Sequence, residues 1–116
     1  MEFEVFGKQR GFTLGTYTFK LINQTAGTKT IEEVFEKMQS NDIGFNLTFY
    51  FCCAKHYAMK LKQTIDFEEV DVADWLDELG QAKTAELTKE LFEVYLLKNL
   101  KAPATGQVLQ SSNGTI

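Results

Sequence analysis

The sequence has few cysteines, no excess of basic charge and no long hydrophobic run, and each of these absences excludes a class of protein. Its two cysteines, Cys52 and Cys53, are adjacent, so we expect no disulfide framework and a reducing compartment, the cytoplasm. Twelve Lys and Arg residues against sixteen Asp and Glu residues give a net charge of −4. This balance argues against general nucleic-acid binding and against adsorption to anionic membranes, because both depend on basic side chains.

No stretch of the chain predicts a membrane span. The longest apolar segment lies near the middle and is interrupted by Asn46, Thr48, Lys55 and His56. It is therefore shorter than the roughly 20 apolar residues that a spanning helix needs. Residues 1–4 contain no basic side chain, so we also expect no signal peptide.

Catalytic and metal-binding motifs are also missing. The sequence contains no glycine-rich phosphate loop, no G-x-S-x-G and no H-E-x-x-H. The single histidine, His56, lies on an apolar stripe, which favours a core role over that of a general base. Cys52, Cys53 and His56 form a C-C-x-x-H cluster, but a structural zinc site uses four ligands in two spaced pairs. The sequence therefore predicts no catalytic residue, no metal site, no cofactor and no enzymatic activity.

The elements that are present indicate one mainly helical domain over residues 1–101. Residues alternate over 2–6, and we expect a second extended piece at 10–13. With Gly7 and Gly11 as turn residues, these segments predict a small N-terminal hairpin. Residues 14–26 favour a strand by propensity but a helix by spacing, and we predict a helix that Gly27 ends.

Two further helices follow. The capping box Thr30-Ile31-Glu32-Glu33 predicts a helix to about residue 40. Residues 44–61 are apolar on two faces, which predicts a buried central helix.

Residues 66–79 carry seven acidic side chains and no basic one. Helical spacing in this segment, with Gly80 after it, predicts an acidic helix that begins at Asp66 or at Asp71. The acids do not keep the spacing of a calcium-binding loop, so we interpret them as a solvated face or as a face that meets a basic partner.

Residues 83–100 predict the last helix, and it is apolar on two nearly opposite faces. Its second face is either covered by the rest of the fold or forms a groove or an interface between copies of the chain. The acidic helix and the last helix together supply the candidate partner-binding residues, which are Trp75, Leu79, Phe92, Leu96 and Leu100. Polar and small residues at 102–116 predict a disordered tail. The predicted fold is thus a hairpin followed by about five helices in a compact bundle.

The order of these elements resembles that of the tail assembly chaperones of long-tailed bacteriophages and prophages. The resemblance covers residues 2–101, and its segments are FTLGTYTFKL (12–21), IEEVFE (31–36), FYFCCAKHYA (49–58) and DVADWLDEL (71–79). The V-A-D-W-L-D-E stretch is its most recognisable part.

This resemblance implies a non-enzymatic protein of the host cytoplasm. Such proteins bind the helical tape-measure protein, keep it soluble and help tail-tube subunits to polymerise around it, and they are absent from the finished particle. Many of their genes also yield a longer frameshifted product. Two other hypotheses remain open at this point: a structural component such as a head–tail connector, which would be present in the virion, and a small enzyme or regulator.

Overall fold

The chain begins with a two-stranded antiparallel hairpin. Strand β1 (Glu2–Val5) pairs with β2 (Lys8–Gly11), so that Glu2 lies opposite Gly11 and Val5 lies opposite Lys8. The two-residue turn has positive φ angles at Phe6 (51°) and Gly7 (74°), as a type I′ turn requires. Because successive side chains point to opposite faces of a strand, Phe3 and Val5 are buried.

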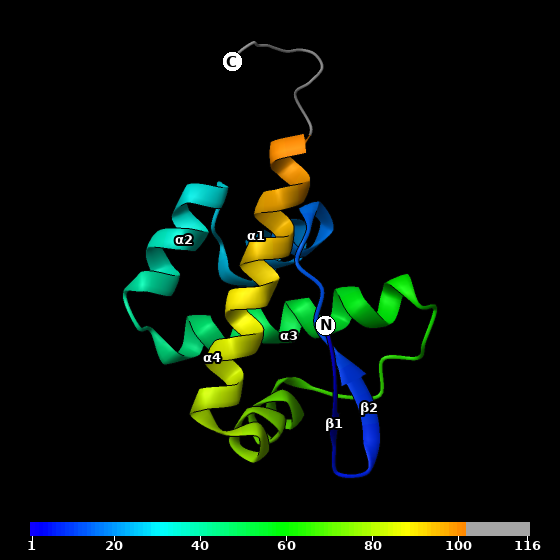
Figure 1. Ribbon diagram of the computed structural model, residues 1–116. Helices are drawn as coiled ribbons and strands as arrows, with labels where there is room; N and C mark the ends of the chain where they lie inside the picture. Colours follow the sequence, from blue (N-terminus) through cyan, green and yellow to red (C-terminus); the bar gives the residue numbers. More distant parts are fainter. Residues whose placement is uncertain (102–116) are drawn as a thin grey trace.

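Four helices follow the hairpin in this computed structural model, which describes residues 1–101 of the chain and their side chains as far as Asn99 (Figure 1). They are α1 (Thr16–Ala26), α2 (Ile31–Gln39), α3 (Ile43–Lys60) and α4 (Glu69–Lys101). The mainly helical class and the presence of the hairpin are as predicted. The second strand was predicted at residues 10–13 and instead begins at Lys8, because the turn is only two residues long, Phe6 and Gly7. The disordered tail predicted at 102–116 lies outside the described residues.

The helix count differs from the prediction of about five because the two predicted C-terminal helices form one element. Within α4, Gly80 has φ 85° and ψ 163°, which is not a helical conformation. The break falls at the glycine that the sequence marks as the end of the acidic helix. It divides α4 into an acidic first segment and a longer second segment.

Local signals set the ends of α1 and α2 as predicted. Gly27 adopts the left-handed conformation after α1, with φ 80°. At the start of α2, the amide of Glu33 donates to Thr30 Oγ1 (3.1 Å), and the amide of Thr30 donates to Glu33 Oε1 (3.1 Å). The strand propensity of residues 16–19 is overridden because one face of α1 enters the core, where Phe19 and Ile22 are buried.

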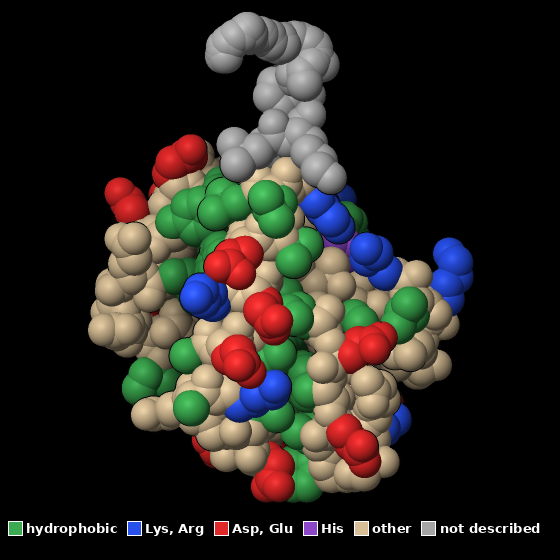
Figure 2. All heavy atoms as spheres, viewed as in Figure 1, with side chains coloured by type: hydrophobic (Ala, Val, Ile, Leu, Met, Phe, Trp, Pro, Cys, Tyr) green, Lys and Arg blue, Asp and Glu red, His purple; other side chains and the backbone are tan. Residues whose placement is uncertain are grey.

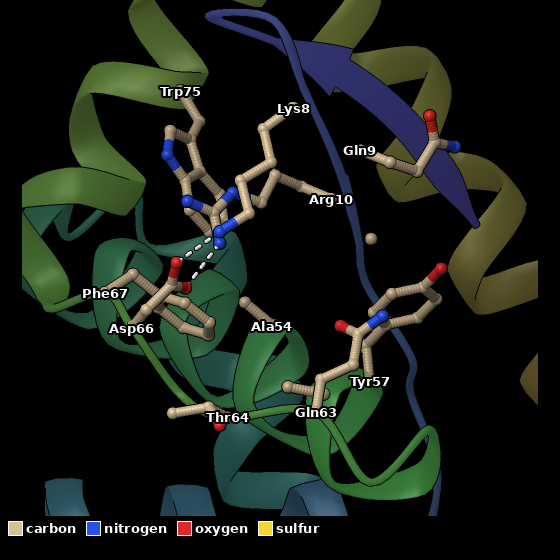
Figure 3. Close-up of a pocket in the computed structure, with 12 residues that line it drawn as sticks. Lys8, Gln9, Arg10, Ala54, Tyr57, Gln63, Thr64, Asp66, Phe67 and Trp75 are labelled. Carbon is tan, nitrogen blue, oxygen red and sulfur yellow. Dashed lines mark hydrogen bonds and ion pairs between the residues drawn. The ribbon is translucent and has the colours of Figure 1, made fainter.

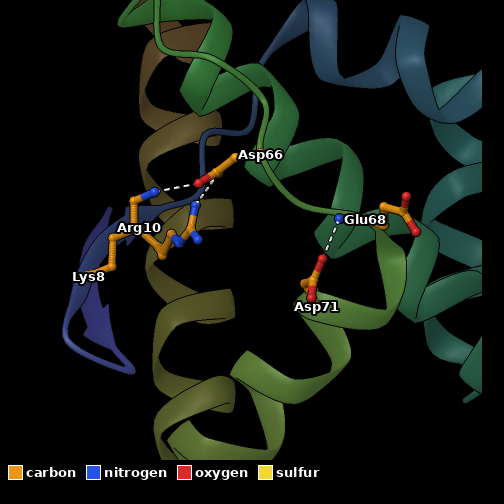
Figure 4. A network of polar contacts seen from close by, with 5 residues as sticks. All are labelled: Lys8, Arg10, Asp66, Glu68 and Asp71. Carbon is orange, nitrogen blue, oxygen red and sulfur yellow. Dashed lines mark hydrogen bonds and ion pairs between the residues drawn. The ribbon is translucent and has the colours of Figure 1, made fainter.

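Neither predicted N-cap begins α4. The helix starts at Glu69, and Asp71 accepts a hydrogen bond from the amide of Glu68 (2.8 Å). Asp66 instead pairs with Lys8 and Arg10 of the hairpin (Figure 4). The competing long-range ion pairs explain why local spacing did not locate the start of this helix.

Helix α3 is the centre of the fold. Figure 1 shows it running across the molecule, with α2 near its N-terminal end and the hairpin on the opposite side. Its residues Phe49, Cys52 and Cys53 are among the most deeply buried of the described residues. Burial raises the pKa of both thiols, as expected for cysteines that act as small hydrophobic side chains.

No helix in the described part of the chain combines the length and the apolar character needed to cross a membrane.

Candidate partner-binding surface

The structure buries Trp75, the most conspicuous of the predicted partner-binding residues. Its side chain is 4% exposed, and its ring lies 5.0 Å from that of Phe67 and 6.2 Å from that of Phe3. The Arg10 guanidinium lies over the Trp75 ring, 4.6 Å from the ring centroid. The hairpin and the segment before α4 therefore cover Trp75, and its contact with a partner stays a prediction.

Phe92 and Leu79 also pack inward. The Phe92 ring stacks on Phe49 at 5.7 Å and lies 5.5 Å from Phe35. Leu79 is half-buried against the same core. For Phe92, the fold thus selects the core alternative over the partner alternative.

Leu96 is the predicted residue that remains at the surface. It is 50% exposed, and the next residue, Leu97, is 60% exposed. Val94 is 46% exposed on another side of the helix, where it lines a hollow with Met1 and Phe12. We call Leu96 and Leu97 the distal face. Figure 2 shows hydrophobic side chains gathered over the last turns of α4 and the neighbouring end of α2. The side chain of Leu100 lies outside the described part of the structure.

Sequence reasoning missed Leu97, because this residue belongs to neither apolar face of the last helix. Leu97 directly follows Leu96, and adjacent residues of a helix do not lie on the same stripe. Helical spacing therefore gave no signal for the exposed Leu97.

The acidic first segment of α4 contributes negative charge at the opposite end of this helix from the distal face. Asp66 pairs with the hairpin, Glu69 accepts a hydrogen bond from Thr48 (3.2 Å) and Asp71 accepts one from a backbone amide. Among the described residues, no Lys or Arg pairs with the exposed residues Asp74, Asp77 and Glu78. These three carboxylates give the first segment of α4 its negative surface.

A groove lies where α3 meets the two segments of α4. It consists of two adjoining hollows of about 220 and 460 Å³ that share Tyr50, Leu76 and Asp77 as walls. We call it the α3–α4 groove. Its other lining residues are Ile43, Asn46, Leu47, Ala73, Gln81, Thr84, Ala85 and Thr88.

Hydrogen bonds fix one wall of this groove. The hydroxyl of Thr88 donates to the carbonyl oxygen of Thr84 (2.8 Å), so the hydroxyl of Tyr50 donates to Thr88 Oγ1 (2.6 Å). Burial raises the pKa of Tyr50, and the phenol therefore stays neutral. Two other buried polar atoms, Asn46 Oδ1 and Thr84 Oγ1, have no hydrogen-bond partner in the described residues.

A second cavity of about 350 Å³ lies between the hairpin and the segment before α4 (Figure 3). Asp66 points toward Lys8 and Arg10, and Arg10 Nη1 donates to Asp66 Oδ1 at 2.7 Å. Tyr57 and Gln63 line the other side. The charged groups pair with one another, so this arrangement attaches the segment to the hairpin.

Acid titration tests this attachment. The hydrogen bonds from Lys8 and Arg10 lower the pKa of Asp66 from 3.8 to about 2. Because the folded-state pKa is depressed, the stabilisation is present above about pH 4 and is lost as the pH falls toward about 2. We expect Asp66→Asn to lower the melting temperature at neutral pH and to match the wild type near pH 2, as followed by circular dichroism.

The exposed neighbour Glu68, which forms no ion pair among the described residues, is the control. Glu68→Gln should leave the acid-dependent loss of stability unchanged. A difference between Asp66→Asn and wild type that stays constant from pH 7 to about 2 would contradict the attachment by charge.

His56 holds α3 against the start of α1. The hydroxyl proton of Thr18 is donated to the carbonyl oxygen of Thr13 (3.0 Å), so Nδ1–H of His56 donates to Thr18 Oγ1 (2.6 Å). Burial, with a smaller effect of Lys60, lowers the pKa of His56. Within residues 1–101, no three His, Cys, Asp or Glu side chains lie together as a metal site would require.

Comparison of the chain with models of protein families, with curated proteins and with solved structures gave no match.

Proposed function

We propose that this protein is a tail assembly chaperone of a long-tailed bacteriophage or prophage, which binds the tape-measure protein without enzymatic chemistry. The observation that carries the proposal is the distal face, where the neighbouring residues Leu96 and Leu97 are exposed together near the end of α4. The sequence resemblance over residues 2–101 supports the same function.

The chemistry of this surface suits a helical partner. Single exposed aliphatic side chains are common, but neighbouring ones form a patch that another protein can cover. An amphipathic helix binds such a surface by laying its own apolar face against it. The carboxylates of the first segment of α4 and the net charge of −4 keep a complex of this kind in solution.

The proposal places the protein in the host cytoplasm and leaves it out of the mature virion. Its main partner is the tape-measure protein, and the tail-tube protein is a second partner. A structural head–tail component would instead remain in the particle, so mass spectrometry of purified virions distinguishes the two.

Co-expression with the tape-measure protein tests the proposed binding. We expect the tagged wild-type chain to retain the tape-measure protein and to increase its soluble fraction. The double variant Leu96→Gln, Leu97→Gln should reduce the retained amount at least about tenfold, which corresponds to about 1.4 kcal/mol. The measurement is the ratio of the two proteins in the eluate.

Val70 provides a matched control, because it is an equally exposed aliphatic residue of α4 outside the distal face. Val70→Gln should bind like the wild type. If the wild-type chain retains no tape-measure protein and leaves its solubility unchanged, the proposed function is wrong.

A further inference from the structure

We propose that the α3–α4 groove binds an apolar protein segment that inserts a lysine or arginine beside Asp77. This inference rests on the proposed function in that the natural occupant is a segment of the partner protein. It adds a second contact, distinct from the distal face, and it specifies the chemistry of the partner.

The shape of the groove suits side chains that enter from another chain. Leu47 and Leu76 give the groove an apolar lining. Ile43 also lines it and is 83% exposed. The hydrogen bond from Tyr50 to Thr88 joins α3 to the second segment of α4. The groove is therefore already formed in the free chain, which lowers the free-energy cost of binding.

Charge determines which apolar segment fits. Asp77 lines both hollows, and no Lys or Arg of residues 1–101 lines either of them. Asp74, three residues before Asp77, and Glu78, directly after it, add negative charge to the same helix segment. A cation at the groove is favoured by all three carboxylates, whereas an acidic segment is repelled.

The Asp77 carboxylate also determines the hydrogen bonds that an occupant can form. Asp77 is exposed, lines both hollows and forms no ion pair among the described residues. Ammonium and guanidinium groups are hydrogen-bond donors without an acceptor, so they complement this carboxylate.

Two other occupants fit less well. The C-terminal residues 102–116 contain no Lys or Arg, so they lack the charge that the groove selects. A second copy of the chain carries the same net charge of −4, and two such copies repel each other. A basic segment of a different protein is the occupant that the charges favour.

Binding of two synthetic peptides to the full-length chain tests the inference. Both are fluorescein-labelled 16-residue amphipathic helices with leucines along one face, and they differ only in a central residue of that face, lysine or norleucine. We expect the lysine peptide to bind at least about tenfold more tightly in a fluorescence anisotropy titration. Asp77→Asn should remove this preference, because the carboxylate that both hollows share is lost.

Asp74→Asn is the matched control, since Asp74 is an exposed carboxylate of the same segment that does not line the groove. It should keep most of the preference for lysine. In addition, Ala85→Trp should fill the groove and weaken both peptides, whereas Ala82→Trp, at an exposed position outside the groove, should weaken neither.

Three results would overturn the inference. The first is equal affinity for the two peptides, and the second is an equal effect of Asp77→Asn and Asp74→Asn. The third is concentration-dependent dimerisation that Ala85→Trp abolishes, which would make a second copy the occupant. The proposed function fails separately, when the wild-type chain does not retain the tape-measure protein. If the wild type retains it and Asp77→Asn retains it equally, only the groove inference fails.

Discussion

Replacing Trp75 by alanine is expected to lower the free energy of unfolding by about 3–5 kcal/mol, the usual cost of removing a large buried aromatic side chain. The indole is 4% exposed and packs against Phe3 and Phe67. The substitution also removes the aromatic surface beneath the Arg10 guanidinium. Because Trp75 is the only tryptophan, urea denaturation should be followed by circular dichroism rather than by fluorescence.

Leu97→Ala is the comparison that separates core residues from surface residues. Leu97 is 60% exposed, so its truncation should change stability by no more than about 0.5 kcal/mol. A Trp75→Ala variant that is as stable as the wild type but fails to retain the tape-measure protein would reverse this assignment. Trp75 would then be a partner contact, as its sequence pattern suggested.

Replacing Gly80 by alanine is expected to destabilise the fold by about 1–3 kcal/mol. The φ of 85° and ψ of 163° at this residue lie in a region that is essentially restricted to glycine. A Cβ at Gly80 would meet no atom within 4 Å. The expected loss is therefore backbone strain alone, and thermal denaturation followed by circular dichroism measures it.

Gly44→Ala is the matched control for this substitution. Gly44 is in the first turn of α3, is exposed, and would place its Cβ at an ordinary distance of 3.5 Å from Asp42 Oδ1. Alanine is favoured over glycine in helices by about 1 kcal/mol, so this variant should be at least as stable as the wild type. A Gly80→Ala variant with higher stability and higher helicity would show that the two segments of α4 join into one straight helix.

The break at Gly80 also links the fold to the candidate surface. Leu76 and Asp77 precede the break and Thr84 and Ala85 follow it, yet all four line the same hollow. Both segments of α4 therefore contribute walls to the groove, and the non-helical backbone of Gly80 joins them.

The sequence by itself determined the features that depend on neighbouring residues. The Thr30–Glu33 capping box and the Gly27 C-cap were confirmed because each is formed within four positions of the chain. The hairpin was predictable for the same reason, since strand alternation and turn glycines are local. Gly80 was identified as a helix end because it directly follows the helical spacing of the acidic segment, and its observed backbone conformation is one that glycine tolerates.

Only the tertiary structure decided which apolar faces are covered. Helical spacing places Trp75, Phe92 and Leu96 on apolar faces, but it does not tell which of these faces has another element packed over it. Arg10 reaches Asp66 from 56 positions away and brings the hairpin over Trp75, while the last turns of α4 leave Leu96 and Leu97 exposed. Burial is a property of contacts between distant segments, so the core and the binding surface of this protein emerge only when the chain is folded.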